Sequence, residues 1–149
     1  MVLLICTVST CLAAVAGLSW LGLQTADEVE VKWEIPVEVQ GGNKIEFGVA
    51  ITNITAEPIT LESIDMSMNY LFGVAIDSTD PPFMESYQFS WLGETFQTYS
   101  FGQHISPGET VTVVFHGRAV KSGDYNGMMT VCINYFFNCR DNVARTIVK

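Results

Sequence analysis

Positive charge is scarce in this chain of 149 residues. It has 7 Lys and Arg against 16 Asp and Glu, which gives a formal net charge of −9 at pH 7. A protein that binds nucleic acid or an anionic membrane surface by electrostatic attraction needs a basic face. The composition therefore argues against a nucleic-acid partner.

Motifs for catalysis are missing as well. The sequence contains no Gly-x-Ser-x-Gly, no phosphate-binding glycine-rich loop ahead of a helix and no His-Glu-x-x-His. No spacing of Asp or Glu residues nominates a pair of catalytic carboxylates. We therefore predict that the protein is not an enzyme and has no catalytic residue, no cofactor and no metal ligand.

Charge is absent altogether from residues 1–24. The stretch from Val2 to Leu23 is apolar apart from small polar residues, and it is long enough to cross a bilayer as a helix. We predict a transmembrane helix or uncleaved signal anchor over residues 1–24, which enters the membrane through residues 2–23. Ala13 and Gly17 form a small-xxx-small pair that would allow close packing against another helix.

Two alternatives remain for this segment. Ala14-Val15-Ala16 matches the small-residue pattern of a signal-peptidase site, in which case the mature protein is secreted or periplasmic. The segment could instead be a helix buried in a protein core. No Lys or Arg precedes Val2, although both export interpretations favour one.

Residues 25–149 are predicted to form one folded domain of strands, because no helical periodicity occurs after Leu23. Apolar and polar residues alternate with period two, the pattern of strands with one buried face, and turn residues separate the runs. A phase slip near Glu62-Ser63 predicts a β-bulge. We expect about eight strands in an antiparallel, immunoglobulin-like β-sandwich. The expected strands are Val29–Ile35, Ile45–Thr52, Ile59–Met68, Tyr87–Trp91, Phe96–Phe101, Thr110–Ala119, Met128–Tyr135 and Val143–Val148.

Residues Ile105–Tyr135 are predicted to form the central hairpin of the sandwich. Thr110–Ala119 alternates cleanly, whereas Met128–Tyr135 is apolar on both faces, as a central strand would be. Turn residues follow the first run, from Ser122 to Gly127. Pairing of the two runs across this turn is the simplest expectation.

The sequence loosely resembles the CARDB and NEW3 types of immunoglobulin-like module from exported bacterial and archaeal proteins. The resemblance covers about half the chain and is carried by Phe47–Asn53, Pro58–Leu61 and Ile105–Val113. In such modules a strand ends in an Asn-containing turn, and a Pro-Gly-Glu turn opens a later strand. The segment Gly123-Asp124-Tyr125 also resembles a tyrosine corner. The resemblance implies a β-sandwich that acts as a spacer or interaction module.

Cys132 and Cys139 are the only cysteines of the predicted domain. A disulfide between them requires an oxidising compartment. If the last hairpin turned at residues 138–141, the two cysteines would lie too far apart to bond. A disulfide therefore requires the chain to fold back around residues 135–137, and two separate thiols are the alternative.

Copper binding is a further alternative, because Cys, His and Met ligands on a β-sandwich would suit that metal. The two histidines are His104 and His116, and Met66 and Met68 offer thioethers on one strand face. A cupredoxin-like site expects a close Cys-His-Met cluster late in the chain, and no histidine follows His116.

The function predicted from these features is a non-catalytic interaction module or accessory subunit of an envelope complex, with the domain outside the cytoplasm. Its partners would be other membrane or envelope proteins, or further copies of itself. A structural subunit of a pilin-like or archaellin-like filament is the alternative, because such subunits also join an apolar helix to a β-sandwich. The expected contact surface is the loop 77–85, whose candidate residues are Pro81, Pro82, Phe83 and Met84.

Overall fold

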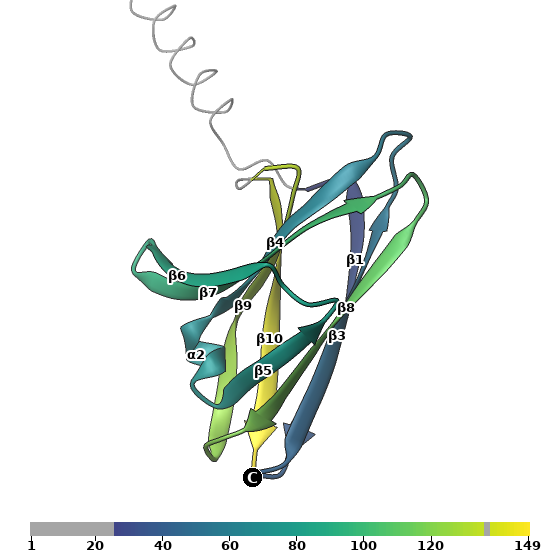
Figure 1. Ribbon diagram of the computed structural model, residues 1–149. Coiled ribbons are helices and arrows are strands. Elements are labelled where there is room, and N and C mark those ends of the chain that lie inside the picture. The colour runs from purple at the N-terminus through teal and green to yellow at the C-terminus, as the bar shows by residue number, and fades with distance from the viewer. Residues whose placement is uncertain (1–25, 136–137) are drawn as a thin grey trace, which may run out of the picture.

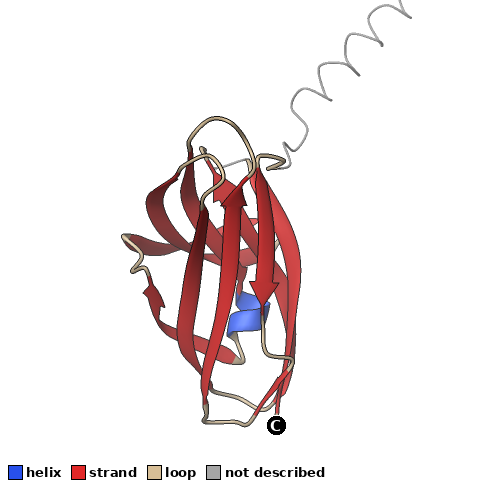
Figure 2. Ribbon diagram, turned by 90° about the vertical axis from the view of Figure 1, so that its right-hand side faces the viewer, coloured by secondary structure: helices blue, strands red, loops and turns tan. Residues whose placement is uncertain are grey.

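The computed structural model describes residues 26–135 and 138–149. Figures 1 and 2 show two twisted sheets packed face to face, with a single turn of helix, α2 (Met68–Leu71), beside them. The strands are β1 (Val29–Glu34), β2 (Glu38–Val39), β3 (Lys44–Asn53), β4 (Ile59–Ser67), β5 (Val74–Asp80), β6 (Glu85–Trp91), β7 (Glu94–Ile105), β8 (Thr110–Ala119), β9 (Gly123–Ile133) and β10 (Cys139–Val148).

The smaller sheet has the strand order β1-β3-β8-β5, and the larger sheet has the order β2-β10-β9-β4-β7-β6. Neighbouring strands are antiparallel except β2 and β10, which run parallel. Two strands, β7 and β6, extend the larger sheet beyond β4, as two extra strands do in variable-type immunoglobulin domains. The prediction of an all-β sandwich is confirmed.

The core forms where the alternating strands turn their apolar faces inward. Phe47 of β3 pairs directly with Phe115 of β8, and their rings stack with centroids 5.2 Å apart. Tyr70 of α2 meets the Phe47 ring edge-on at 6.1 Å. All three side chains are almost completely buried, and each contributes about 1.5–3 kcal/mol to folding by leaving water. The half-buried strands predicted over residues 45–52 and 110–119 are confirmed.

The register of β4 against both of its neighbours shifts between Leu61 and Ser63. This irregularity lies where the sequence predicts a bulge, and it lets Leu61 and Ile64 both face the core, where neither is exposed. β9 lies between β10 and β4, so the prediction of a central strand over Met128–Tyr135 is confirmed as far as Ile133, where β9 ends.

The predicted hairpin between residues 105–119 and 128–135 is wrong. β8 pairs with β3 and β5 in the smaller sheet, whereas β9 pairs with β10 and β4 in the larger one. The connection from Ala119 to Gly123 therefore crosses from one sheet to the other at the end of the sandwich. Alternation shows that one face of a strand is buried, but it does not show which sheet the strand joins.

The predicted loop over residues 77–85 is shorter than expected, because β5 continues to Asp80 and β6 begins at Glu85. Thr79 closes the remaining turn: its hydroxyl donates to the Pro81 carbonyl at 2.8 Å and accepts from the Phe83 amide at 3.1 Å. The short helix α2 was also not predicted, since one turn carries no periodicity.

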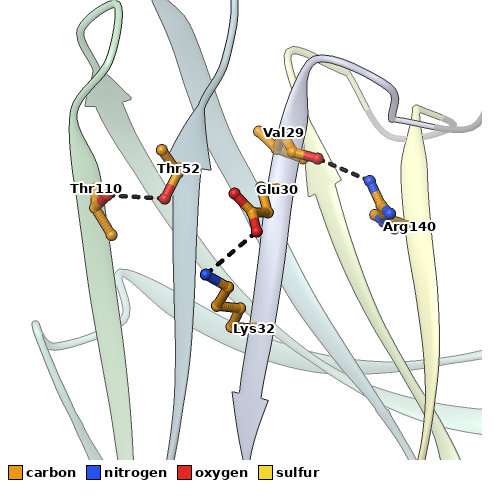
Figure 3. A network of polar contacts seen from close by, with 6 residues as sticks. All are labelled: Val29, Glu30, Lys32, Thr52, Thr110 and Arg140. Carbon is orange, nitrogen blue, oxygen red and sulfur yellow. Dashed lines mark hydrogen bonds and ion pairs between the residues drawn. The ribbon is translucent and has the colours of Figure 1, made fainter.

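Polar contacts join the two sheets at the end where the described chain begins. In Figure 3 the Arg140 guanidinium of β10 donates to the Val29 carbonyl of β1, at 2.8 Å. Glu30 and Lys32 form an ion pair at 3.2 Å on the exposed side of β1. The contact from Arg140 therefore links the larger sheet to the edge strand of the smaller one.

The predicted transmembrane helix, with the helix-packing candidates Ala13 and Gly17, lies outside the described residues. Within the described residues, no helix has the length and apolar character needed to cross a membrane.

Candidate functional site

The β6–β7 hairpin forms one edge of the larger sheet and extends to the side of the sandwich (Figure 1). Its strands pair from Glu85 opposite Ser100 to Trp91 opposite Glu94, with no shift of register. The loop contains only Leu92 and Gly93. Phe89 and Phe96 face each other across the ladder with ring centroids 5.3 Å apart, which gives the hairpin an internal aromatic contact.

Large apolar side chains on this hairpin remain exposed. Tyr87 is 40% exposed, Trp91 is 58% exposed and Leu92 is 92% exposed, and Met84, just before β6, is 71% exposed. Tyr87 and Trp91 are four positions apart in one strand, and side chains an even number of positions apart lie on the same face, so both lie on the outer face of the sheet. Exposed apolar residues that gather on one element are typical of an interaction surface, whereas isolated ones are common on any protein.

The backbone at the hairpin tip has a left-handed conformation that is unusual for leucine. Both loop residues have positive φ, 49° at Leu92 and 82° at Gly93. A two-residue hairpin loop of this kind favours Asn or Gly at the first position. A leucine in this left-handed conformation lowers the stability of the domain by about 1–2 kcal/mol. Its exposed side chain contributes little to the core of the domain.

A groove of about 380 Å³ separates the hairpin tip from α2. Ser67 donates to Glu94 at 2.5 Å beside it, and Gln88 contacts the Met68 sulfur at 3.7 Å. The lining of the groove is therefore mainly polar, and it includes a carboxylate anchored by Ser67. Its lining residues are Met68, Asn69, Leu92, Gly93, Glu94 and Thr95.

A row of polar side chains crosses the outer face of the same sheet next to the hairpin. Asp65 of β4 pairs with Thr98 of β7 on one side and with Thr130 of β9 on the other. The Thr130 hydroxyl donates to Asp141 at 2.8 Å. Burial raises the pKa of Asp65, the hydroxyls of Thr98 and Ser63 lower it, and the charge of Asp141 raises it further, so the net shift is upward. No cation is among the groups that shift this pKa.

The four predicted contact residues do not behave as one surface. Phe83 packs against the core, with its ring edge-to-face with Tyr99 at 5.3 Å, and Pro81 is half-buried after a cis peptide bond from Asp80. Pro82 and Met84 are exposed. Met84 therefore belongs to the exposed apolar group of the hairpin, whereas Phe83 is a packing residue.

The hairpin itself was not predicted as a contact surface. Tyr87, Phe89 and Trp91 alternate with polar residues, which is also the pattern of a strand that buries its aromatic face. The signal that could have found the site is Leu92-Gly93, because a leucine ahead of glycine in a two-residue loop departs from ordinary turn chemistry.

The structure joins Cys132 and Cys139 by a disulfide, with Cα atoms 4.0 Å apart. The two residues are direct partners in the β9–β10 ladder, so the chain does fold back after residue 133. The disulfide lies on the outer face of the larger sheet, where the Cys132 sulfur is 3.7 Å from a carboxylate oxygen of Asp65.

The two histidines lie on different sheets. His104 of β7 contacts the Thr60 hydroxyl at 3.1 Å, and His116 of β8 pairs with Glu46 at 3.1 Å. The structure therefore does not place the two histidines in one cluster. Among residues 26–135 and 138–149, no three His, Cys, Asp or Glu side chains are grouped to hold a metal ion.

No protein family and no curated protein matches the sequence. Among solved structures, AvmM, which catalyses macrocyclization in alchivemycin A biosynthesis, matches with a TM-score of 0.55 at 10% identity, over 85% of this chain and 92% of AvmM. The cupredoxin domain of amoB from Nitrosocaldus yellowstonii matches with a TM-score of 0.51 at 10% identity, over 86% of this chain and 90% of that domain.

A CARDB domain from Pyrococcus furiosus matches with a TM-score of 0.47 at 14% identity, over 86% of this chain and 94% of that domain. Likeness at such low identity shows the β-sandwich fold alone, and function has to be argued from the site.

Proposed function

We propose that this protein is a non-catalytic interaction module that contacts partner proteins through the outer face and tip of the β6–β7 hairpin. The observation that carries the proposal is the exposure of Tyr87, Trp91 and Leu92 on one extended hairpin. Aromatic and large aliphatic side chains of this kind are the residues that most often dominate binding energy at protein interfaces.

The backbone at Leu92 supports the same conclusion. A left-handed leucine lowers the stability of the free domain, and burial of its side chain by a partner would recover about 1.5–3 kcal/mol. The groove beside α2 would receive a polar or positively charged side chain of the partner, and Glu94 in its lining would accept a hydrogen bond or an ion pair.

The proposed setting is the outer side of a membrane, as an accessory subunit of an envelope complex. The supporting observations are the charge-free residues 1–24 and the pairing of Cys132 with Cys139, because disulfides persist in oxidising compartments. The intact mass of the protein from its native membrane fraction tests this setting. A mass that includes residues 1–24 is expected for an anchored subunit, and a mass that lacks them would contradict the anchor.

Capture of partners from native membranes tests the contact surface. The tagged full chain is compared with a Trp91→Ser/Leu92→Ser double variant, and captured proteins are quantified by mass spectrometry after mild cross-linking. The control is Val37→Ser, which removes an apolar side chain that is 71% exposed beside β2, at the opposite edge of the larger sheet. We expect the double variant to lose specific proteins that the control retains. Equal capture by all three chains would refute the proposal.

A further inference from the structure

The outer edge of β6 lacks the features that keep strand edges from pairing with other chains. The other edge strands have features that disfavour such pairing. Charged side chains alternate along β1, and β2 has only two residues. β5 has a register shift between Ile76 and Ser78 and is followed by Pro81. β6 contains no Lys, no Pro and no shift of register. Within the part of the chain that the structure describes, β7 is its one neighbour.

The direction of the backbone groups of β6 follows from the two-residue loop. Residues that flank such a loop form a hydrogen-bonded pair, and hydrogen-bonded pairs then alternate along the ladder. The odd-numbered residues of β6 therefore direct their backbone groups toward β7; the Tyr87 carbonyl, for example, accepts from the Gln97 side chain at 3.2 Å. Ser86, Gln88 and Ser90 direct theirs toward the open edge.

We propose, on the basis of the interaction surface assigned above, that β6 pairs antiparallel with β6 of a second copy of this chain. A two-fold axis at Gln88 places Gln88 opposite its own copy and Ser86 opposite Ser90 of the other chain. Each of these pairs exchanges both backbone hydrogen bonds. The two larger sheets become one continuous sheet, and the interface is isologous, as in most symmetric dimers.

The side chains of β6 are self-complementary in this register. Tyr87 lies opposite Phe89 of the second copy, so the aromatic residues of both chains share the outer face as cross-strand pairs. Glu85 is the one charged residue of β6, and it lies opposite Trp91, so no like charges meet. The dimer also joins the two exposed hairpin faces into one wider apolar surface for a partner.

Net charge opposes this association at long range, because each chain carries −9. Salt screens such repulsion, while hydrogen bonds and apolar contacts at the strand edge are affected little. The dimer is therefore expected to strengthen as ionic strength rises. A contact made by ion pairs would show the opposite dependence.

Site-specific cross-linking of the full chain in mild detergent tests the register. In a Cys6→Ser/Cys11→Ser background, Gln88→Cys places a thiol next to its own copy at the two-fold axis. Thr112→Cys, an exposed position on β8 of the smaller sheet, is the control. We expect oxidation to give a covalent dimer with Gln88→Cys and little with Thr112→Cys. Equal cross-linking of the two variants would overturn the proposal.

Proline at the axis provides a second test. Gln88→Pro removes an N–H that points away from β7, so the hairpin keeps its own ladder. We expect sedimentation velocity to show a dimer weakened by roughly tenfold or more, as loss of the two hydrogen bonds at the axis predicts, with the far-UV circular dichroism unchanged. A Gln88→Pro dimer as strong as the wild-type dimer would overturn edge pairing.

The two proposals fail in distinguishable ways. A wild-type chain that stays monomeric at all salt concentrations overturns the self-pairing. If that monomer still captures partners, and loses them with Trp91→Ser/Leu92→Ser, the proposed function stands without the dimer. Loss of the dimer in Gln88→Pro with capture retained supports edge pairing as a separate property of the same hairpin.

Discussion

The phenol of Tyr125, at the start of β9, donates a hydrogen bond of 3.1 Å to the carbonyl of Ser122. This is the contact of a tyrosine corner, which fixes the crossing from β8 to β9. Gly73 lies so close to the Tyr125 ring that a Cβ at that position would overlap it. The position of the ring is therefore fixed by the hydrogen bond of its hydroxyl to Ser122 and by its close packing against Gly73.

Removal of that hydroxyl should destabilise the domain without changing its shape. We expect Tyr125→Phe to lower the free energy of unfolding by about 1 kcal/mol, because the Ser122 carbonyl loses its partner. Urea unfolding of the full chain in mild detergent measures the change. Tyr135→Phe is the matched control, since Tyr135 is 55% exposed and should change stability by less than about 0.5 kcal/mol. Equal effects of the two substitutions would show that the corner contributes nothing.

The disulfide between Cys132 and Cys139 closes a short loop at the end of β9 and β10. A bridge over so few residues restricts the unfolded chain less than a long-range bridge does. We expect Cys132→Ser/Cys139→Ser to lose about 2 kcal/mol of unfolding free energy. Reductant should lower the urea midpoint of the wild type toward that of the variant and leave the variant unchanged. A wild-type midpoint that does not respond to reductant would contradict this prediction.

Asp65 is expected to make stability depend on pH. Its pKa is raised in the folded protein, chiefly by burial, so the folded state holds this proton more tightly than the unfolded state. The stability from protonated Asp65 is complete below the ordinary value of 3.8 and is lost as pH rises through the folded pKa. Asp65→Asn should therefore gain stability over wild type as pH is raised from acid to neutral.

The variant Thr98→Val tests the cause of that dependence. The Thr98 hydroxyl lowers the pKa of Asp65, so its replacement by a methyl group of similar shape should raise that pKa further. We expect Thr98→Val to lose more stability than wild type between acid and neutral pH. Urea unfolding over a pH series measures both variants. A stability difference between Asp65→Asn and wild type that is constant with pH would refute the assignment.

Much of the sandwich could be predicted, because period-two alternation in β3 and β8 reports burial of one face directly. The irregularity at Leu61 and Ser63 was predictable for the same reason, since an inserted residue breaks the phase. Sheet membership was not predictable: the residues that flank Ser122 satisfy the rules for a hairpin turn and for a crossing between sheets equally well. Which partner a strand takes is decided by packing over the whole domain.

The site was harder to predict than the fold. Phe83 and Met84 are adjacent and both apolar, yet one packs on Tyr99 and the other is exposed. Their difference depends on where the turn after β5 places each side chain, and local sequence does not encode that. Trp91 belongs to an alternating pattern that would look the same with its aromatic face buried.

The hairpin tip allows stability and binding to be separated. Leu92 holds a left-handed backbone that asparagine adopts more readily. We expect Leu92→Asn to raise the free energy of unfolding by about 0.5–1 kcal/mol and to weaken capture of partner proteins at the same time. Leu92→Ala is the informative control, because it removes the side chain and keeps an unfavourable backbone. It should weaken capture as strongly without the gain in stability. If Leu92→Asn stabilises the domain and captures partners as well as wild type, the leucine has no binding role, and the contact must be made by Trp91 and Tyr87 alone.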